Sequence, residues 1–153
     1  MNVEFINPFI NALIKVIDVM GHTELTYEKP RIKKNDVAMG DVSGLIGMVG
    51  SKTKGSLSIT FEKSLALRIM QRMVGDKLEE IDEEITDMVG EITNMVSGGA
   101  KLELSKKGYE FDMATPMVVS GTNHTIDHIH EGHVIIIPFG SDSGKAFIEI
   151  CFD

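Results

Sequence analysis

The sequence predicts an α+β fold in which long helices pack on one face of a mainly antiparallel sheet. Two segments, 9–20 and 85–96, repeat apolar residues at helical spacing. From residue 113 onward, short apolar or alternating runs are separated by glycine-containing turns, which is typical of consecutive strands. Strands that follow one another through short turns pair as antiparallel neighbours, and helices then cover one face of the sheet.

The first helix is expected to begin at Asn7 and Pro8. An asparagine side chain can cap a helix, and proline suits the first helical position. The apolar stripe that follows faces the core, and Gly21 ends it.

Three strands are expected before the second helix. Leu25–Arg31 has the pattern of a short strand, and residues 33–36 form a polar turn. Val42–Val49 and Gly55–Phe61 are expected to form a hairpin across the turn at residues 51–54.

The second helix is predicted over Leu65–Val74, with Ser64 as its cap and Gly75 at its end. The acidic segment that follows, residues 76–84, leads into the next helix, because negative charge in a first turn favours the helix dipole. Its carboxylates lack the glycine-centred spacing of a calcium loop.

The central helix is expected to continue through Gly98-Gly99 to about Ser105. Each glycine inside a helix costs about 1 kcal/mol relative to alanine, so this pair indicates either close backbone packing or an earlier end. One face of the helix carries an apolar stripe that belongs to the core. Its members are Ile85, Met88, Val89, Ile92, Met95 and Val96.

The remaining chain is expected to form four strands, with turns at 121, 131–132 and 140–144. They span Met113–Ser120, Thr122–His130, His133–Phe139 and Lys145–Phe152. No Gly-x-Gly-x-x-Gly or Gly-x-x-x-x-Gly-Lys-Ser/Thr pattern follows a strand, so neither a dinucleotide-binding nor a P-loop fold is supported.

Composition sets the broad class. A chain of 153 residues with 42% hydrophobic residues can bury a core as a single domain spanning residues 1–153. No apolar run reaches membrane-spanning length and no signal-peptide pattern opens the chain, so a cytoplasmic protein without a membrane partner is expected. The formal charge of −8 argues against nucleic acid. Cys151 is the single cysteine, which excludes an internal disulfide.

Four histidines lie within ten residues: His124, His128, His130 and His133. On a continuous strand the first three would project from one face, and imidazole is a common metal ligand. Structural metal sites usually gather ligands from a turn or from separate elements, and no cysteine accompanies these histidines. An exposed or partly satisfied polar strand is therefore the preferred interpretation, with metal binding as the alternative.

Three polar residues of the central helix fall on one narrow arc. Glu91 follows Asp87 by four positions, and Asn94 follows Glu91 by three. At about 100° per residue, this arc faces away from the apolar stripe. A solvated helix face is the ordinary meaning of such a pattern. The functional interpretation is that a rigid helix presents a carboxylate beside a carboxamide to another molecule.

This pattern resembles the signature of the CheC/CheX/FliY phosphatases of bacterial chemotaxis, which act on the phosphorylated response regulator CheY. Pro116, 22 positions beyond Asn94, completes the resemblance. Three further stretches resemble the CheX branch and extend the likeness over almost the whole chain. They are the opening Glu4-Phe-Ile-Asn-Pro-Phe9, the strand 44–50 and Thr115-Pro-Met-Val-Val-Ser-Gly121.

The resemblance implies an enzyme that hydrolyses the aspartyl phosphate of a CheY-like receiver domain. Asn94 would orient the attacking water, Glu91 would pair with a lysine of the receiver, and Asp87 and Pro116 would support the site. The chain itself would bind no cofactor or metal, because the receiver supplies both its aspartate and its Mg²⁺. The resemblance also implies a homodimer, joined through sheet edges.

CheC and FliY normally carry two such motifs. Glu4 and Asn7 have the right spacing for a second copy, but Asn7 precedes Pro8 and is better explained as a helix cap. Lys29 stands where a proline would be needed, and Pro30 comes one place late. One active site per chain is therefore expected. The rival hypothesis is a noncatalytic module that uses the same helix only to bind a receiver domain.

Overall fold

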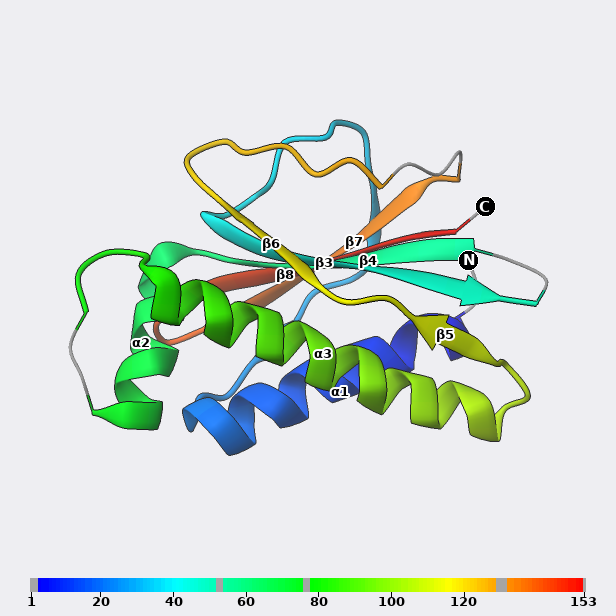
Figure 1. Ribbon diagram of the computed structural model, residues 1–153, viewed down its shortest axis with the longest axis horizontal. Helices are drawn as coiled ribbons and strands as arrows, with labels where there is room; N and C mark the ends of the chain where they lie inside the picture. Colours follow the sequence, from blue (N-terminus) through cyan, green and yellow to red (C-terminus); the bar gives the residue numbers. More distant parts are fainter. Residues whose placement is uncertain (1–2, 52–53, 76–77, 129–131, 153) are drawn as a thin grey trace.

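The structure is a computed structural model that describes residues 3–51, 54–75, 78–128 and 132–152. Its three helices, α1 (Val3–Gly21), α2 (Lys63–Val74) and α3 (Glu83–Lys106), lie on one side of an antiparallel sheet (Figure 1). The strands are β1 (Thr26–Tyr27), β2 (Arg31–Lys33), β3 (Val42–Gly50), β4 (Lys54–Phe61), β5 (Phe111–Met113), β6 (Met117–Ser120), β7 (Val134–Ser141) and β8 (Gly144–Phe152). The predicted α+β fold, with helices on one face of the sheet, is confirmed.

The sheet runs in the order β1-β7-β8-β4-β3-β5, and every pairing within it is antiparallel. Two short strands complete its edges, β2 beside β7 and β6 beside β3. Successive side chains of a strand point to opposite faces, so one row of residues crosses the sheet on the side of the helices. This row consists of Ile46, Leu57, Ile150 and Ile135.

The main core lies between this face and the helices. Phe9, Leu13 and Ile17 of α1 are fully buried, as is Ile92 of α3. Each such side chain stabilises the fold by roughly 1.5–3 kcal/mol relative to its exposed state. None of the helices in the described residues is both long and apolar enough to cross a bilayer.

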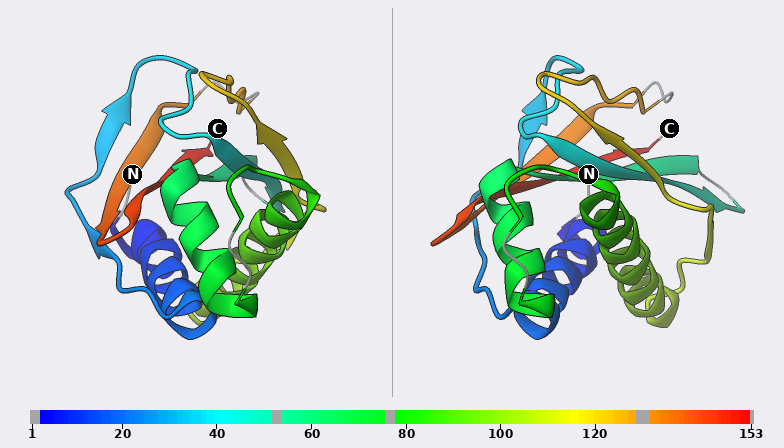
Figure 2. Two further views of the ribbon diagram at one scale, coloured as in Figure 1. Left: turned by 90° about the vertical axis from the view of Figure 1, so that its left-hand side faces the viewer. Right: turned by 60° about the vertical axis from the view of Figure 1, so that its left-hand side comes forward.

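Two segments, 34–41 and 121–128, cover the opposite face of the sheet, and we call them together the outer strap (Figures 1 and 2). They are joined by an isolated bridge between Val37 and Thr125. The Ala38 N–H donates to the His124 carbonyl oxygen at 2.8 Å, and the Ile126 N–H donates to the Asp36 carbonyl oxygen at 2.7 Å. The outer strap therefore covers the central strands, and Ser43, Ser58 and Thr60 on this face are fully buried.

Two predicted helix caps are wrong. Helix α1 begins at Val3, so Asn7 is not its cap and Pro8 lies inside the helix. Proline has no N–H to bond the carbonyl four residues earlier, and the Lys107 ammonium donates to this Glu4 oxygen at 3.4 Å. Helix α2 begins at Lys63 instead of after a Ser64 cap. The side chain of its N-cap residue, Glu62, makes no capping hydrogen bond, but Asp41 Oδ2 accepts a hydrogen bond from the Lys63 N–H at 2.7 Å.

The predicted C-terminal end of α2 and the predicted course of α3 are confirmed. Gly75 ends α2 with a left-handed φ of 83°, a conformation that glycine adopts without strain. Helix α3 runs through Gly98 and Gly99, and the close packing expected there occurs at Gly99. A Cβ added at that position would lie 3.4 Å from Ala12 of α1, whereas one added at Gly98 would meet open space.

Three predicted strands differ from the structure. Leu25–Arg31 gives two short strands, β1 and β2, that flank Pro30. Met113–Ser120 is divided into β5 and β6. Thr122–His130 forms no strand over residues 122–128, which belong to the outer strap, and residues 129–130 lie outside the described residues.

Candidate functional site

Helix α3 is a rigid support for the predicted site. Its N-cap is Asp82, whose side chain accepts a hydrogen bond from the Ile85 N–H at 3.0 Å. Glu83 and Glu84 follow in the first turn, where negative charge interacts favourably with the helix dipole. Its buried side packs against the sheet and the other helices. The buried residues are Ile85, Met88, Val89, Ile92, Thr93, Val96, Ser97, Ala100 and Leu104.

The structure places Asp87, Glu91 and Asn94 on the solvent side of α3, and all three are exposed. They fall within an arc of about 60° at helical spacing. Within the described residues, neither carboxylate forms an ion pair and the Asn94 side chain forms no hydrogen bond. Their polar groups are therefore available to another molecule.

Met95 was predicted to belong to the core, and this prediction is wrong. Met95 lies next to Asn94 and is 40% exposed. Leu102, two turns further along α3, is 61% exposed. The helical period explains the error, because Met95 stands at the margin of the apolar stripe and turns toward solvent.

The short strand β6 lies beside the part of α3 that carries the site. A Cβ added at Gly90 would lie 3.4 Å from Val118 of β6, so the helix and the strand approach closely there. Gly90 therefore faces β6 of this chain.

Pro116 lies between β5 and β6, where the ladder with β3 changes register. Met48 pairs with Met113 and Leu45 with Met117, so one more residue lies between the paired positions on the β5–β6 side. This is a bulge, a place where a residue without an N–H is tolerated in a sheet. Pro116 thus marks the bend next to β6, and its part in the site stays a prediction.

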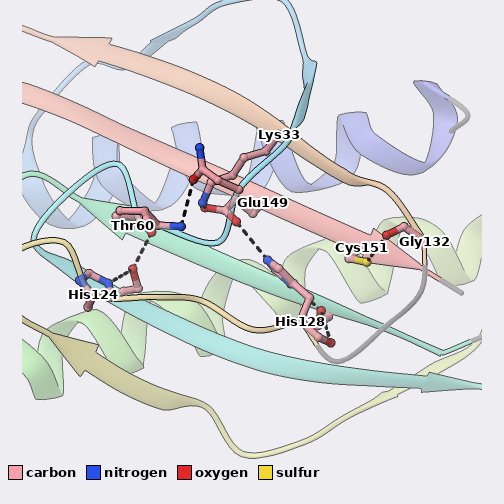
Figure 3. Close-up of polar contacts among 11 residues, drawn as sticks. Lys33, Thr60, His124, His128, Gly132, Glu149 and Cys151 are labelled. Carbon is pink, nitrogen blue, oxygen red and sulfur yellow. Dashed lines mark hydrogen bonds and ion pairs between the residues drawn. The ribbon is translucent and has the colours of Figure 1, made fainter.

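The histidines of the predicted cluster are used separately (Figure 3). The His124 ring bonds Ser43 Oγ at 2.7 Å and the Gly121 carbonyl oxygen at 2.8 Å. The His128 ring bonds Ser56 Oγ at 2.6 Å and Glu149 Oε1 at 3.1 Å. Both rings therefore hold the outer strap on the sheet.

His133 is exposed, and His130 lies outside the described residues. Within those residues, no three side chains of the metal-ligating types gather in a position to hold an ion.

Glu149 joins a second buried contact that sequence spacing did not reveal. Lys33 Nζ lies 2.8 Å from Glu149 Oε2, and the two side chains are 5% and 1% exposed. The partners are 116 positions apart in the sequence, and Lys33 was predicted to lie in a turn. No local pattern could have paired them.

Glu4 and Asn7, the rejected second motif, lie exposed in the first two turns of α1. The helix-cap explanation for Asn7 is wrong, as described above. The missing proline 22 positions beyond Asn7 still distinguishes this pair from Glu91 and Asn94.

Residues 42–140 match the protein family described as chemotaxis phosphatase CheX. This range includes α3 and Pro116. The chain belongs to the CheX family.

Individual members agree with this assignment. A CheC-like superfamily protein from Shewanella sp. PV-4, known from a crystal structure, is 64% identical with a TM-score of 0.94, covering 100% of this chain and 99% of that one. The CheY-P phosphatase CheX of Thermotoga maritima is 27% identical over 149 residues, which are 96% of this chain and 94% of that protein.

A second similar structure contains a bound partner. It is a CheX–CheY–BeF₃–Mg²⁺ complex from Borrelia burgdorferi, whose matched chain is 25% identical with a TM-score of 0.81 and coverage of 99% of both chains. The CheX fold thus extends over essentially the whole of this chain.

Proposed function

We propose that this CheX-family protein is a phosphatase that hydrolyses the aspartyl phosphate of a CheY-like response regulator. The Thermotoga relative is named as a CheY-P phosphatase, and the Borrelia relative was solved with CheY, BeF₃ and Mg²⁺. The observation that carries the proposal for this chain is the exposed pair Glu91 and Asn94, free of partners within the described residues, on a helix whose other side is buried.

Asn94 is assigned the role of orienting water. A carboxamide offers both a donor and an acceptor, so it can hold a water molecule in line with the phosphorus without a change of protonation state. The receiver contributes the phosphorylated aspartate and its Mg²⁺, which supplies charge stabilisation on the phosphoryl oxygens. This chain needs no metal of its own for that step.

Glu91 is assigned a docking role. It lies one helical turn before Asn94, and its carboxylate would pair with a lysine of the receiver domain. Once Glu91 is held in this way, the position of Asn94 relative to the phosphoryl group is fixed as well. Asp87 and Pro116 are assigned supporting roles, Asp87 on the same arc and Pro116 at the bulge beside β6.

The test measures phosphoryl loss from candidate receiver domains with and without this protein. Asn94→Ala is expected to abolish the acceleration without loss of folding, because alanine is the best helix former and the site is exposed. Glu91→Ala is expected to raise KM and lower the rate. The matched control is Glu103→Ala, which is also an exposed residue of α3 but lies about 18 Å further along the helix than Glu91 and about 120° around its axis. It is expected to keep the wild-type rate.

The same assay separates the rival function. A module that only binds receivers would bind a phosphorylated receiver and leave its dephosphorylation rate unchanged. Equal rates for wild type and Asn94→Ala, both above the spontaneous rate, would refute the assigned mechanism.

We also propose a homodimer, joined through sheet edges. The described sheet ends in short strands on both sides, β1 and β2 along β7 and β5 and β6 along β3, and backbone groups at such edges can pair with a second chain. Sedimentation equilibrium measures the mass directly, and a monomer at micromolar concentration would contradict the proposal.

A further inference from the structure

Strand β3 and helix α3 approach each other closely at Gly44 and Thr93. Thr93 is fully buried, and its hydroxyl donates to the Val89 carbonyl oxygen at 2.8 Å. A Cβ added at Gly44 would overlap Thr93 Oγ1 and would lie 3.0 Å from Thr93 Cβ. Only a residue without a side chain fits beneath the helix at this point.

This contact lies directly under the proposed site. Thr93 is the residue before Asn94 and follows Glu91 by two positions, and it points inward where they point outward. Gly44 pairs with Val118 of β6, the residue that approaches Gly90 of α3. The turn of α3 that carries the site therefore rests on β3 and against β6 at the same level.

We propose that Gly44 and Thr93 are positioning residues for the phosphatase reaction. Their contact sets how deeply the turn bearing Glu91 and Asn94 sits against β3, and hence where Asn94 lies relative to β6 and its neighbouring bulge. The inference rests on the proposed function. It adds a second requirement to the exposure of Glu91 and Asn94. The distance of α3 from β3 and the rotation of α3 about its axis must also be fixed.

The size of the expected effect follows from the geometry. Carbon atoms in comfortable contact are about 3.5–4.0 Å apart, so even with Oγ1 rotated away a Cβ at Gly44 forces a separation of about 0.5 Å or more. An error of about 1 Å in the placement of a reacting group costs about 100-fold in rate. A loss of kcat of about 10- to 100-fold is therefore expected from one added methyl group.

The experiment compares Gly44→Ala with Gly47→Ala. Both change a glycine of β3 to alanine, but a Cβ at Gly47 would meet only Ala114, at 3.9 Å, which is an ordinary contact. Receiver dephosphorylation is measured at saturating receiver and normalised to folded protein by circular dichroism. Gly47→Ala is expected to stay within about twofold of wild-type kcat, whereas Gly44→Ala loses about 10- to 100-fold, mainly in kcat.

A second pair of variants tests the contact itself. Thr93→Ala removes the overlapping hydroxyl, so adding it to Gly44→Ala is expected to restore part of kcat. Because the 3.0 Å Cβ–Cβ contact remains, the double variant should stay below Thr93→Ala alone by about three- to tenfold. Comparing the double variant with Thr93→Ala tests the positioning role even if Gly44→Ala alone fails to fold.

Three results would overturn the inference. One is a folded Gly44→Ala with wild-type kcat, another is an equal loss in Gly47→Ala, and the third is a double variant equal to Thr93→Ala. The proposed function fails separately, through an unchanged rate in Asn94→Ala. Loss of activity in Asn94→Ala together with full activity in Gly44→Ala would refute only the positioning role.

Discussion

Replacing Lys33 by methionine is expected to destabilise the protein strongly. The ammonium lies 2.8 Å from Glu149 Oε2, and both side chains are almost completely buried. Without it, the carboxylate keeps its bond to His128 at 3.1 Å but has no lysine to neutralise it. Breaking a buried pair by removing one partner costs about 3–5 kcal/mol. We expect the lower value, about 3 kcal/mol, because the bond to His128 remains.

This cost is large for a small protein, because the free energy of unfolding is typically about 5–15 kcal/mol. In a chain of this length, 3 kcal/mol lowers the melting temperature by about 6–12 °C. Chemical denaturation followed by circular dichroism gives the free energy of unfolding, and differential scanning calorimetry gives the melting temperature.

The matched control is Lys63→Met. Lys63 Nζ lies 2.9 Å from Glu80 Oε2, almost the same distance, but the two side chains are 40% and 82% exposed. Exposed pairs contribute at most about 1 kcal/mol, so this variant should be close to wild type. Adding Glu149→Gln to Lys33→Met removes the unpaired charge and should recover at least half of the loss. A Lys33→Met variant no less stable than Lys63→Met would refute the reasoning.

Two smaller effects follow from local contacts. Asp82→Ala removes the cap that accepts the Ile85 N–H at 3.0 Å, and thermal unfolding should show a loss of about 1 kcal/mol; an unchanged melting temperature would contradict the cap. The hydrogen bond from the Ser143 hydroxyl, and to a lesser extent Arg72, holds the pKa of the Asp142 carboxyl below its usual value. Ser143→Ala should therefore raise the pKa of Asp142 in a carbon-13 NMR titration, and a pKa that stays in place would exclude this cause.

The fold class could be predicted because the apolar periods change along the chain. Helical spacing marks residues 85–96 and strand spacing marks the chain from residue 113 onward, and both patterns follow from which face is buried. The helix starts were harder to predict. Asn7-Pro8 has the sequence of a cap followed by a first-turn proline, yet α1 begins at Val3. Burial of Phe5 and Ile6 extends the helix through the proline, because tertiary packing outweighs a local signal.

The outer strap could not be predicted, for a different physical reason. Ser56, Ser58 and Thr60 alternate with apolar residues along β4, which is typical of a strand with one face in water. In the structure Ser58 and Thr60 are fully buried. The cover comes from the outer strap, whose second segment, 121–128, is distant in sequence from β4 and overlaps the stretch Thr122–His130, which has the alternating pattern of a strand. Alternation reports two unlike faces, but a polar face can be covered when most of its groups find hydrogen-bond partners. Thr60 Oγ1 lies 2.6 Å from Ser43 Oγ and Ser56 Oγ lies 2.6 Å from His128 Nδ1, whereas the Ser58 hydroxyl has no partner among the described residues.

Whether polar groups are satisfied within the chain also distinguishes the two sets of residues that first suggested a function, the histidine cluster and the pair Glu91 and Asn94. The His128 ring is bonded through both nitrogens, and Glu149 accepts from both Lys33 and His128. Such groups are satisfied within the chain and cannot be offered to a partner without loss of stability. Glu91 and Asn94 differ because they are exposed and form no such contacts within the described residues. Residue type drew attention to the histidines and to the helix pair alike, but His124 and His128 are bonded within the chain, whereas Glu91 and Asn94 are exposed and form no such bonds within the described residues. The site on α3 is therefore the one whose mutation should remove activity while the fold persists.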